Sequence, residues 1–316
     1  MNATFDLIEN NVGMITRKTT GAYAVQTRTE TMECTLAGRL RHAGLTDGLT
    51  VGDLVRLAPA GNSGWQIIET LPRRNQLSRR SAVPMPGAHA HEQVIAANVD
   101  QVIPVFAAAD PAPHWNMLDR YLVSAEAAEI PALVCITKLD LTQTAAGEPE
   151  ADLLAVVEEY RRIGYPVMMV SARTGAGLEA LRQVLQGRVS VLLGKSGVGK
   201  SSLLNALEPG LGLRVSAVSE YTGKGRHTTT HLEMFMLEYG GAIIDTPGVR
   251  EFGLWDVAED DLALFYPEMR PYVGRCRFGL DCRHDEEPGC AIRKAVMDGQ
   301  ISPRRYQSYL RLQVEA

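Results

Sequence analysis

The sequence predicts a multidomain α/β protein, and three changes of pattern along its 316 residues indicate this class. Residues 1 to about 70 contain short alternating stretches separated by Gly and Asp, the pattern of a small β barrel. From about residue 93, short apolar runs alternate with helical patterns, which is typical of a doubly wound α/β domain. After about residue 257, a Cys/His cluster and two helical stretches predict a small C-terminal helical domain.

The N-terminal barrel is predicted from strand-like stretches at 22–27, 32–36, 51–57 and 64–68. Four or five strands in this length fit an OB-type barrel and a generic small barrel equally well. We assign residues 1–75 to this barrel.

A basic stretch at 72–80 follows the barrel, and we assign residues 76–92 to a basic linker. Its cations are Arg73, Arg74, Arg79 and Arg80. Such a stretch is either a solvated linker or a patch that contacts RNA phosphates. Taken alone, the linker interpretation is favoured, and the four arginines are candidates for RNA contact.

The central domain is assigned to residues 93–256. Its predicted strands are continuous apolar runs, as expected for parallel strands that are buried on both faces. They lie at 102–106, 132–136, 166–170, 189–193 and 242–244, and the predicted helices at 118–128, 151–163, 178–185 and 201–207.

The strongest motif lies between the strand at 189–193 and the next helix. Gly194-Lys195-Ser196-Gly197-Val198-Gly199-Lys200-Ser201 fits the pattern G-x-x-x-x-G-K-[ST] of the P-loop. Backbone N–H groups of such a loop hold phosphates, Lys200 would reach the β and γ phosphates, and the Ser201 hydroxyl would hold Mg²⁺. Ser202 completes this predicted phosphate site. A chance Gly-rich turn is the alternative, and the strand and helix on either side disfavour it.

A second motif, Asp245-Thr246-Pro247-Gly248, follows the strand at 242–244. Asp245 could bind Mg²⁺, and the Gly248 N–H could donate to a γ phosphate. The same four residues also make a good turn, but a position downstream of a P-loop favours the phosphate interpretation.

Two further strand ends carry residues suited to reading a guanine base. Thr137-Lys138-Leu139-Asp140 resembles N-K-x-D, in which the Asp accepts two hydrogen bonds from the base and the Lys stem covers the ring. Ser171-Ala172-Arg173 resembles the second base-reading loop, with the Ala172 N–H as donor. Sheets of this class bind ligands at such strand ends.

The order of these motifs predicts a circularly permuted GTPase. The base-reading motifs precede the P-loop, whereas the Thr-rich loop at 228–230 and the Asp245 motif follow it. The segment that would sense the γ phosphate therefore leads directly into the Cys/His region, so nucleotide state could be transmitted there.

The Thr-rich loop offers the remaining catalytic candidates. A Thr hydroxyl here could complete the Mg²⁺ site. Val249 stands after Gly248, where many GTPases have a catalytic Gln, so His227 is the candidate for positioning the attacking water. A solvated His on a surface loop is an equally good interpretation.

Cys276, Cys282, His284 and Cys290 lie within 15 residues of one another. Three Cys and one His make a tetrahedral zinc set, and four protein ligands indicate a structural site with one Zn²⁺ per chain. The spacing differs from the common C-x₂-C pattern, but clustered free Cys are the poorer alternative. We assign residues 257–316 to this domain.

Taken together, these features resemble the ribosome small-subunit-dependent GTPase A family, also called RsgA or YjeQ. Further similar stretches are 92–100, 118–122 and 305–310. The resemblance implies an OB-fold, a permuted GTPase domain and a zinc-binding domain. It implies a factor that binds the small ribosomal subunit late in maturation and is released on subunit-stimulated GTP hydrolysis. By position, Thr229 matches the Mg²⁺-binding Thr, and His227 matches the proposed catalytic His.

Thr137 stands where that family usually has Asn, so one side-chain amide contact to the base and the P-loop is lost. A Thr hydroxyl could keep a hydrogen bond worth about 0.5–1.5 kcal/mol. Because Asp140 carries most of the guanine selectivity, a preference for GTP is expected to survive at weaker affinity.

Composition bounds the possible partners. The net charge is −5, but residues 1–80 carry 10 Lys and Arg against 7 Asp and Glu, and the rest carries 22 against 30. This excludes only a uniformly basic RNA binder. No secretory signal and no membrane span are expected, so we predict a cytoplasmic monomer whose partners are GTP or GDP and the rRNA and proteins of the small subunit.

Two other functions fit parts of the sequence. An RNA-binding scaffold with a degenerate nucleotide site is disfavoured by the intact Lys200, Ser201 and Asp245. A zinc-containing P-loop ATPase of RNA metabolism is disfavoured by Asp140 and by the pair Ser171 and Ala172.

Overall fold

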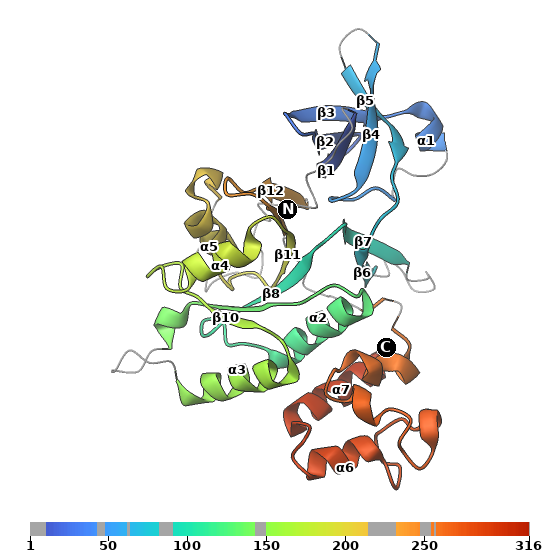
Figure 1. Ribbon diagram of the computed structural model, residues 1–316, viewed down its shortest axis with the longest axis vertical. Coiled ribbons are helices and arrows are strands. Elements are labelled where there is room, and N and C mark those ends of the chain that lie inside the picture. Colours follow the sequence, from blue (N-terminus) through green and yellow to red (C-terminus); the bar gives the residue numbers. More distant parts are fainter. Residues whose placement is uncertain are drawn as a thin grey trace, which may run out of the picture.

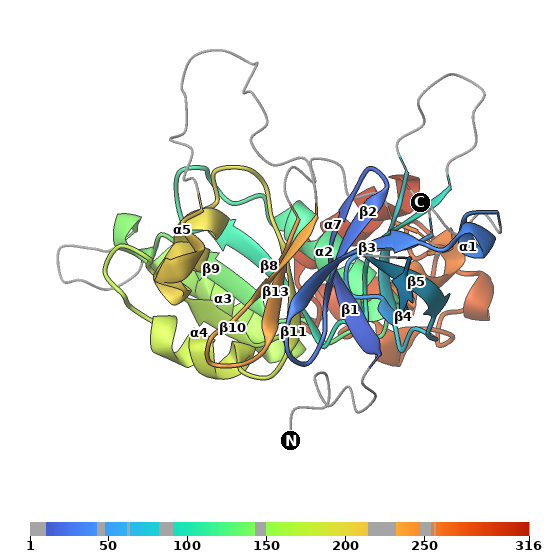
Figure 2. The same ribbon diagram turned by 90° about the horizontal axis from the view of Figure 1, so that it is seen from above.

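The computed structural model describes residues 11–42, 48–61, 64–81, 91–142, 150–213, 232–246, 254–255 and 257–315. The barrel lies at one end of the molecule, the α/β domain in the middle and the C-terminal domain at the other end (Figure 1). Seen from above, the barrel strands lie beside the central sheet (Figure 2).

The barrel has five strands and one short helix. They are β1 (Val12–Thr19), β2 (Ala22–Gln26), β3 (Thr31–Leu36), α1 (Gly38–His42), β4 (Leu54–Ala60) and β5 (Gly64–Thr70). The strands follow the order β1-β2-β3-β5-β4, and β1 also pairs with β4, which closes the barrel. This closed five-stranded order identifies the OB-type barrel among the two alternatives. Its core is formed by inward-facing residues such as Ile15, Val25 and Ile67.

Part of the expected basic linker is a β hairpin. Strand β6 (Gln76–Arg80) pairs antiparallel with β7 (Glu92–Ala97). Leu77 on β6 is fully buried and packs with Ile95 and Ala96 of β7 in the core of the α/β domain. One apolar position in five residues is a weak strand signal, and the pairing partner lies beyond residues 82–90, so the sequence did not indicate this hairpin.

The α/β domain contributes six strands in the order β10-β9-β8-β11-β13-β12. All neighbours are parallel except β12, which is antiparallel to β13. The strands are β8 (Gln101–Ala107), β9 (Val134–Thr137), β10 (Val167–Met169), β11 (Val189–Leu193), β12 (Glu233–Met236) and β13 (Ala242–Asp245). Strand β11 enters the sheet between β8 and β13, so the late P-loop strand lies at the centre, as a permuted order requires.

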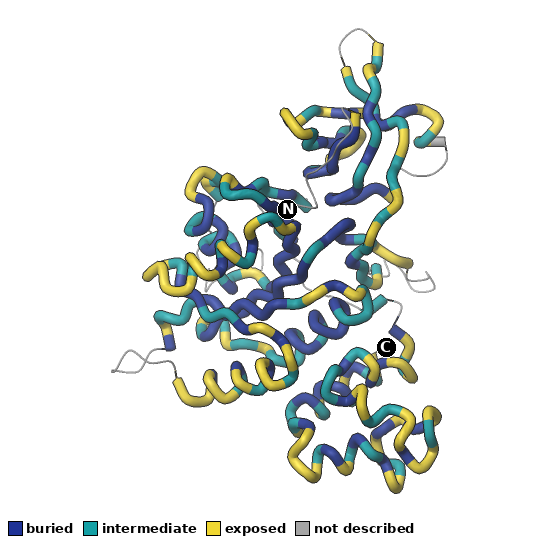
Figure 3. The backbone as a smooth tube through the Cα atoms, in the orientation of Figure 1, coloured by how far each residue is buried: buried dark blue, intermediate teal, exposed yellow. Residues whose placement is uncertain are grey.

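Helices cover both faces of this sheet. They are α2 (Trp115–Ala127), α3 (Ala151–Ile163), α4 (Leu178–Leu185) and α5 (Lys200–Leu207). Alternate strand residues pack against α2 and α3 on one face and against α4 and α5 on the other. Strands β8 and β11 are therefore buried along their whole length (Figure 3), which explains their continuous apolar sequence.

The C-terminal domain consists of short helical pieces. They are η3 (Glu259–Phe265), η4 (Arg270–Tyr272), η5 (Gly279–Asp281), α6 (Ala291–Met297) and α7 (Pro303–Glu315). Val123 of α2 belongs to the same apolar cluster as Tyr266, Ile292 and Tyr309, so this domain packs directly on the α/β domain. In Figure 1, α7 lies beside α2.

The barrel and the central sheet are joined edge to edge. Strand β1 pairs antiparallel with β12 at Arg17 and Glu233, which gives one continuous sheet of 11 strands. The Arg17 Nη1 also lies 3.6 Å from the Glu233 Oε1. Within the described ranges, no helix combines the length and apolarity that crossing a membrane requires.

Candidate functional site

The P-loop connects β11 to the first residue of α5. Gly199 caps α5 with a φ of 95°, a conformation that side chains other than Gly rarely adopt. Gly194 lies so close to β8 that a Cβ there would be 2.5 Å from the Val105 oxygen. These two glycines let the loop fold tightly and leave backbone N–H groups at the start of α5, where anions bind.

Lys200 is folded into this loop. Its side chain is 8% exposed, and its Nζ donates to the Gly194 oxygen at 2.6 Å and to the Lys195 oxygen at 3.3 Å. Burial lowers the pKa of Lys200, and the Asp245 carboxylate opposes this shift. A buried ammonium whose hydrogen bonds go to two loop carbonyls is well suited to a phosphate anion.

Asp245 ends β13, next to Leu192 of β11. Its Oδ1 is buried and has no hydrogen-bond partner among the described residues. Burial raises the pKa of this carboxyl group, and the charge of Lys200 opposes the shift. A buried carboxylate oxygen without a partner among the described residues, close to the charge of Lys200, fits a hard divalent cation such as Mg²⁺. Ser201 lies in the first turn of α5, directly after Lys200.

The base-reading loop is tied to the P-loop through Thr137. This residue ends β9 and is 3% exposed. Its Oγ1 donates to the Val198 oxygen at 2.5 Å, and the Phe106 oxygen lies 3.2 Å away. The hydroxyl bond expected for Thr in place of Asn is therefore present, and its P-loop partner is the Val198 carbonyl.

Asp140 is held by the second base-reading loop. Its Oδ1 accepts from the Ser171 Oγ at 2.5 Å, while the exposed Arg173 lies 3.8 Å from its Oδ2. The Ser171 Oγ in turn accepts from the Thr174 N–H at 3.2 Å. Ala172 lies beside this serine. The Asp140 carboxylate is thus oriented by the loop that carries Ser171 and Arg173.

Lys138 has a left-handed backbone conformation with φ of 56°, and its Nζ donates to the Asp110 oxygen. Its Cε would lie 3.8 Å from a Cβ placed on Gly199. The side chain of Lys138 therefore extends from the base-reading loop to the P-loop at Gly199.

The structure brings together the predicted residues of 137–140, 171–172, 194–202 and Asp245 at the carboxyl edge of the sheet. Three predicted residues, His227, Thr229 and Gly248, lie outside the described residues.

The predicted metal ligands converge in the C-terminal domain. The donor atoms of Cys276, Cys282, His284 and Cys290 all lie within 4.8 Å of one another, and all four residues are buried. Tetrahedral zinc with Zn–S bonds of about 2.3 Å and Zn–N bonds of about 2.0 Å places two sulfurs about 3.8 Å apart and a sulfur and a nitrogen about 3.5 Å apart. The Cys276 and Cys290 Sγ atoms are 3.8 Å apart, and each is 3.4–3.5 Å from the His284 Nδ1.

Neighbouring groups orient these ligands. The Ala291 N–H donates to the Cys276 Sγ at 3.2 Å, and the Arg293 N–H donates to the Cys290 Sγ at 3.4 Å. The Tyr306 hydroxyl donates to the His284 oxygen at 2.7 Å. N–H groups directed at sulfur stabilise thiolates, so the set can hold a metal ion.

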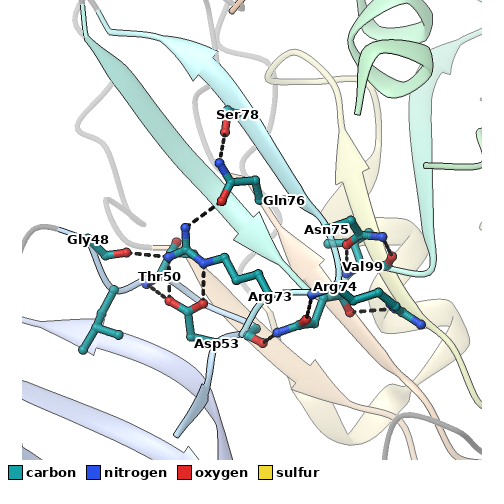
Figure 4. A network of polar contacts seen from close by, with 12 residues as sticks. Gly48, Thr50, Asp53, Arg73, Arg74, Asn75, Gln76, Ser78 and Val99 are labelled. Atoms are coloured by element: carbon teal, nitrogen blue, oxygen red, sulfur yellow. Dashed lines mark hydrogen bonds and ion pairs between the residues drawn. The ribbon is translucent and has the colours of Figure 1, made fainter. Parts of the chain in front are cut away.

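Three of the arginines considered for RNA contact, Arg73, Arg74 and Arg79, have partners within the chain. The Arg73 guanidinium binds both Asp53 oxygens, at 2.7 and 2.9 Å, and this hydrogen-bonded pair raises the pKa of Arg73. It also donates to the Gly48 oxygen and the Gln76 side chain, as Figure 4 shows. Arg73 therefore joins the barrel to the hairpin.

Arg74 joins the hairpin to the central sheet. Its Nη2 donates to the Asp100 Oδ1 at 2.6 Å, and the Asp100 Oδ2 accepts from the Val189 N–H at the start of β11. Next to it, the Asn75 side chain bonds both backbone groups of Val99 (Figure 4). Sequence reasoning missed these partners because they lie 20 or more residues away with no local signal.

Arg79 and Arg80 lie on β6. The Arg79 Nε donates to the Gln93 Oε1 at 2.9 Å, and Arg80 is exposed. RNA contact by any of the four arginines stays a prediction, and it competes with existing partners at Arg73, Arg74 and Arg79.

Comparison with known proteins agrees with this geometry. The family described as RsgA GTPase matches residues 70–255. The chain is 46% identical over 310 residues to the Gemmatimonas aurantiaca protein named "Small ribosomal subunit biogenesis GTPase RsgA", covering 97% of both chains. A protein of the same name from Azotobacter vinelandii is 45% identical over 91% of this chain and 81% of its own.

Solved structures agree as well. The crystal structure of YjeQ from Thermotoga maritima matches with a TM-score of 0.75 at 32% identity, over 96% of this chain and 98% of that one. The structure of YloQ, described as a circularly permuted GTPase, matches with a TM-score of 0.72 at 31% identity, over 96% and 94%. With a family match over more than half of its length, this chain belongs to the RsgA GTPase family.

Proposed function

We propose that this chain is a GTP-hydrolysing assembly factor for late maturation of the small ribosomal subunit. The observation that carries the nucleotide part is the hydrogen bond from Thr137 to the Val198 carbonyl, which joins the base-reading loop to the P-loop. The names of its relatives, small ribosomal subunit biogenesis GTPases, support the partner. Binding of the subunit would stimulate hydrolysis, and hydrolysis would drive release.

In this proposal the chain's own residues bind and orient the triphosphate. P-loop N–H groups and the Lys200 ammonium hold the β and γ phosphates, and the Gly248 N–H donates to the γ phosphate. Ser201, Thr229 and Asp245 hold Mg²⁺, which when bound neutralises charge on the phosphate oxygens. His227 orients the attacking water and accepts its proton.

The guanine base is recognised through its hydrogen-bonding edge. The Asp140 carboxylate, held by Ser171, accepts hydrogen bonds from the base, and the Ala172 N–H donates to the guanine carbonyl. Thr137 acts behind the base, because its single hydroxyl proton is directed at the protein.

Removal of the Thr137 hydroxyl tests this arrangement. Thr137→Val keeps the side-chain shape but leaves the Val198 carbonyl without this donor, which costs about 1–3 kcal/mol for a buried acceptor. We expect the Kd for GTP to rise about tenfold, measured by titration with fluorescent GTP.

The control for that variant is Thr137→Ser, which keeps the hydroxyl and should bind GTP nearly as the native chain does. Competition with ATP is measured on all three proteins. Equal binding of ATP and GTP to the native chain would overturn the guanine assignment and favour the ATPase alternative.

The remaining parts of the proposal concern partners and metal. The barrel, the exposed Arg80 with Arg79, and the C-terminal domain contact rRNA or ribosomal proteins. The metal of the C-terminal domain is one structural Zn²⁺, as its thiolate-rich donor set favours. The protein acts as a monomer in the cytoplasm.

GTP turnover with and without isolated small subunits tests the function. We expect turnover to rise strongly on addition of small subunits. We also expect co-sedimentation with them in a non-hydrolysable GTP analogue and weaker co-sedimentation in GDP. Turnover that does not respond to subunits would favour the RNA-binding scaffold.

His227→Ala is the informative variant in the same assay. It should bind GTP as tightly as the native chain and lose the stimulated part of the turnover, because only the positioning of water is removed. Normal stimulated turnover would exclude His227 from the mechanism.

A further inference from the structure

Two stretches that resemble the family, 118–122 and 305–310, contain none of the predicted nucleotide-binding residues or metal ligands, although the Tyr306 hydroxyl donates to the His284 oxygen. The first lies on α2 of the α/β domain and the second on α7 of the C-terminal domain. The structure brings them into contact at Asp119 and Arg305, which are 186 positions apart in the chain.

Arg305 is fully buried and paired on two sides. Its Nη1 donates to the Asp119 Oδ1 at 2.6 Å, and Asp119 is also fully buried. Its Nε and Nη2 donate to the two oxygens of Glu268 at 2.7 and 3.1 Å. The guanidinium carbon lies 4.4 Å from the centre of the Tyr266 ring. The Arg305 guanidinium therefore binds one carboxylate from each domain. Asp119 belongs to α2 of the α/β domain, whereas Glu268 and the neighbouring Tyr266 belong to the C-terminal domain.

A second layer surrounds this pair. The Tyr160 hydroxyl of α3 donates to the Asp119 Oδ1 at 2.6 Å. The Arg304 Nη1 donates to the Tyr160 hydroxyl at 3.1 Å, and its Nε donates to Glu159 at 3.1 Å. We call Asp119, Tyr160, Glu268, Arg304 and Arg305 the interdomain cluster. The anions of α2 and α3 thus face the cations of α7.

Charges this deeply buried are stable only in one geometry. Burial disfavours the charge of Arg305, but Asp119 and Glu268 outweigh it and hold the pKa of Arg305 well above its usual value. Loss of one partner would leave an uncompensated buried charge, which is strongly destabilising. Sliding or rotation of the C-terminal domain on α2 would have the same effect, so the cluster selects one orientation of the two domains.

The same helix also reaches the nucleotide site. Helix α2 begins at Trp115, shortly after Asp110, whose carbonyl accepts from Lys138 of the base-reading loop. The Trp115 ring stacks on Phe106 of β8 at 6.4 Å and lies 6.4 Å from the Tyr160 ring. Asp119 follows one turn later. The C-terminal domain is therefore fixed to the base-reading side of the α/β domain by packed side chains and one short helix segment.

We propose that the interdomain cluster fixes the orientation of the C-terminal domain, and that this orientation is needed for a partner bound to that domain to stimulate hydrolysis. Arg305 is a positioning residue in this account: its partners Asp119 and Glu268 are not residues of the predicted nucleotide site, and it acts through the placement of a domain. The second half rests on the proposed function, in which the partner is the small ribosomal subunit. Basal nucleotide binding does not depend on the cluster.

The test uses Arg305→Met in the full-length chain, with Arg311→Met as the matched control, because Arg311 lies on the same helix and is exposed. Spin labels on cysteines introduced at the exposed Leu154 of α3 and Met297 of α6 report the distance between the two domains. We expect a narrow distance distribution in the native chain and the control, and a broad one in Arg305→Met. Asp119→Asn, which keeps the size and removes one charge, is the second variant in case Arg305→Met fails to fold.

Turnover is measured on the same proteins. In the cluster variants, we expect GTP affinity and basal turnover to stay unchanged, while subunit-stimulated turnover falls at least about tenfold, within the range of typical coupling between sites. A narrow distance distribution in the variants, or full stimulation despite a broad one, overturns the inference. An equal loss of basal turnover does so too, since it would place the cluster in the nucleotide site.

Failure of the proposed function is visible separately. If small subunits do not stimulate the native chain, the proposed function is wrong and the second half of the inference is lost with it. The distance distributions still decide whether the cluster fixes the domain orientation.

Discussion

Lys200→Met is expected to remove almost all GTP turnover without destabilising the nucleotide-free protein. The ammonium would make charge-assisted hydrogen bonds to phosphate, each worth about 1.5–3 kcal/mol. Its loss should raise the Kd for GTP about 10- to 100-fold and lower turnover about 10²- to 10³-fold. Burial lowers the pKa of Lys200, so keeping this side chain charged reduces the stability of the folded protein. An apolar side chain of similar length removes the desolvation cost of the ammonium, which offsets the loss of the charge that opposes Asp245, so we expect the stability of the free protein to change by no more than about 1 kcal/mol.

Thermal unfolding with and without GTP measures both effects at once. Saturating GTP at 100 times its Kd should stabilise the native chain by about 2.7 kcal/mol, and should shift the variant far less. Lys294→Met is the control, since Lys294 is a surface residue of α6 that pairs only with Asp298 among its described contacts. If Lys200→Met unfolds at a much lower temperature without nucleotide, Lys200 has a structural role instead.

Removal of the metal should unfold the C-terminal domain and leave the nucleotide site able to bind GTP. The loop from Cys276 to Cys290 has only short helical pieces, and its buried thiols form part of the domain's core. Binding of structural zinc contributes about 10–16 kcal/mol to the folding free energy of small domains. This is as large as the whole free energy of unfolding of a typical domain, so the domain should not stay folded without the metal. Most buried apolar residues of α2 to α5 belong to other clusters, with Val123 of α2 as an exception, so GTP binding should persist.

Metal analysis and tyrosine signals check this expectation. The native chain, never exposed to chelator, should contain one zinc, and Cys290→Ala should contain none. The near-UV signal should fall with the metal, because Tyr309 packs edge-on against Tyr266 at 5.7 Å and lies 6.3 Å from His284. Cys34→Ala removes a buried thiol of the barrel and should keep the metal. A native chain without metal, or a Tyr signal indifferent to its loss, would contradict the proposal.

The nucleotide site could be located from the sequence because its motifs follow strands that are buried on both faces. Such strands appear as apolar runs, and the run at 189–193 coincides with β11. Strands β6 and β12 are mostly not buried and contain no apolar run of that length. Glu233–Met236 forms β12 and Gln76–Arg80 forms β6, although only Met234 and Leu77 are buried in them.

Contacts between distant charges could not be predicted in the same way. Arg73 and Arg74 were interpreted as candidates for RNA because four arginines lie close together in the sequence. Their partners Asp53 and Asp100 are acidic residues with no distinguishing pattern, and only the folded chain brings them near. Asp119 and Arg305, 186 positions apart, illustrate the same limit. The resemblance marked both stretches, but the pairing between them required the structure.

The pairing of β1 with β12 affects which fragments of the chain can be prepared without the barrel. Without the barrel, β12 would become the edge strand of a six-stranded sheet. The side of β12 that faces β1, opposite to β13, would then expose backbone N–H and C=O groups. Exposed edge strands of this kind pair with other copies of a protein and promote aggregation. The barrel thus also protects the sheet against self-association, and a fragment that begins after residue 70 loses this protection.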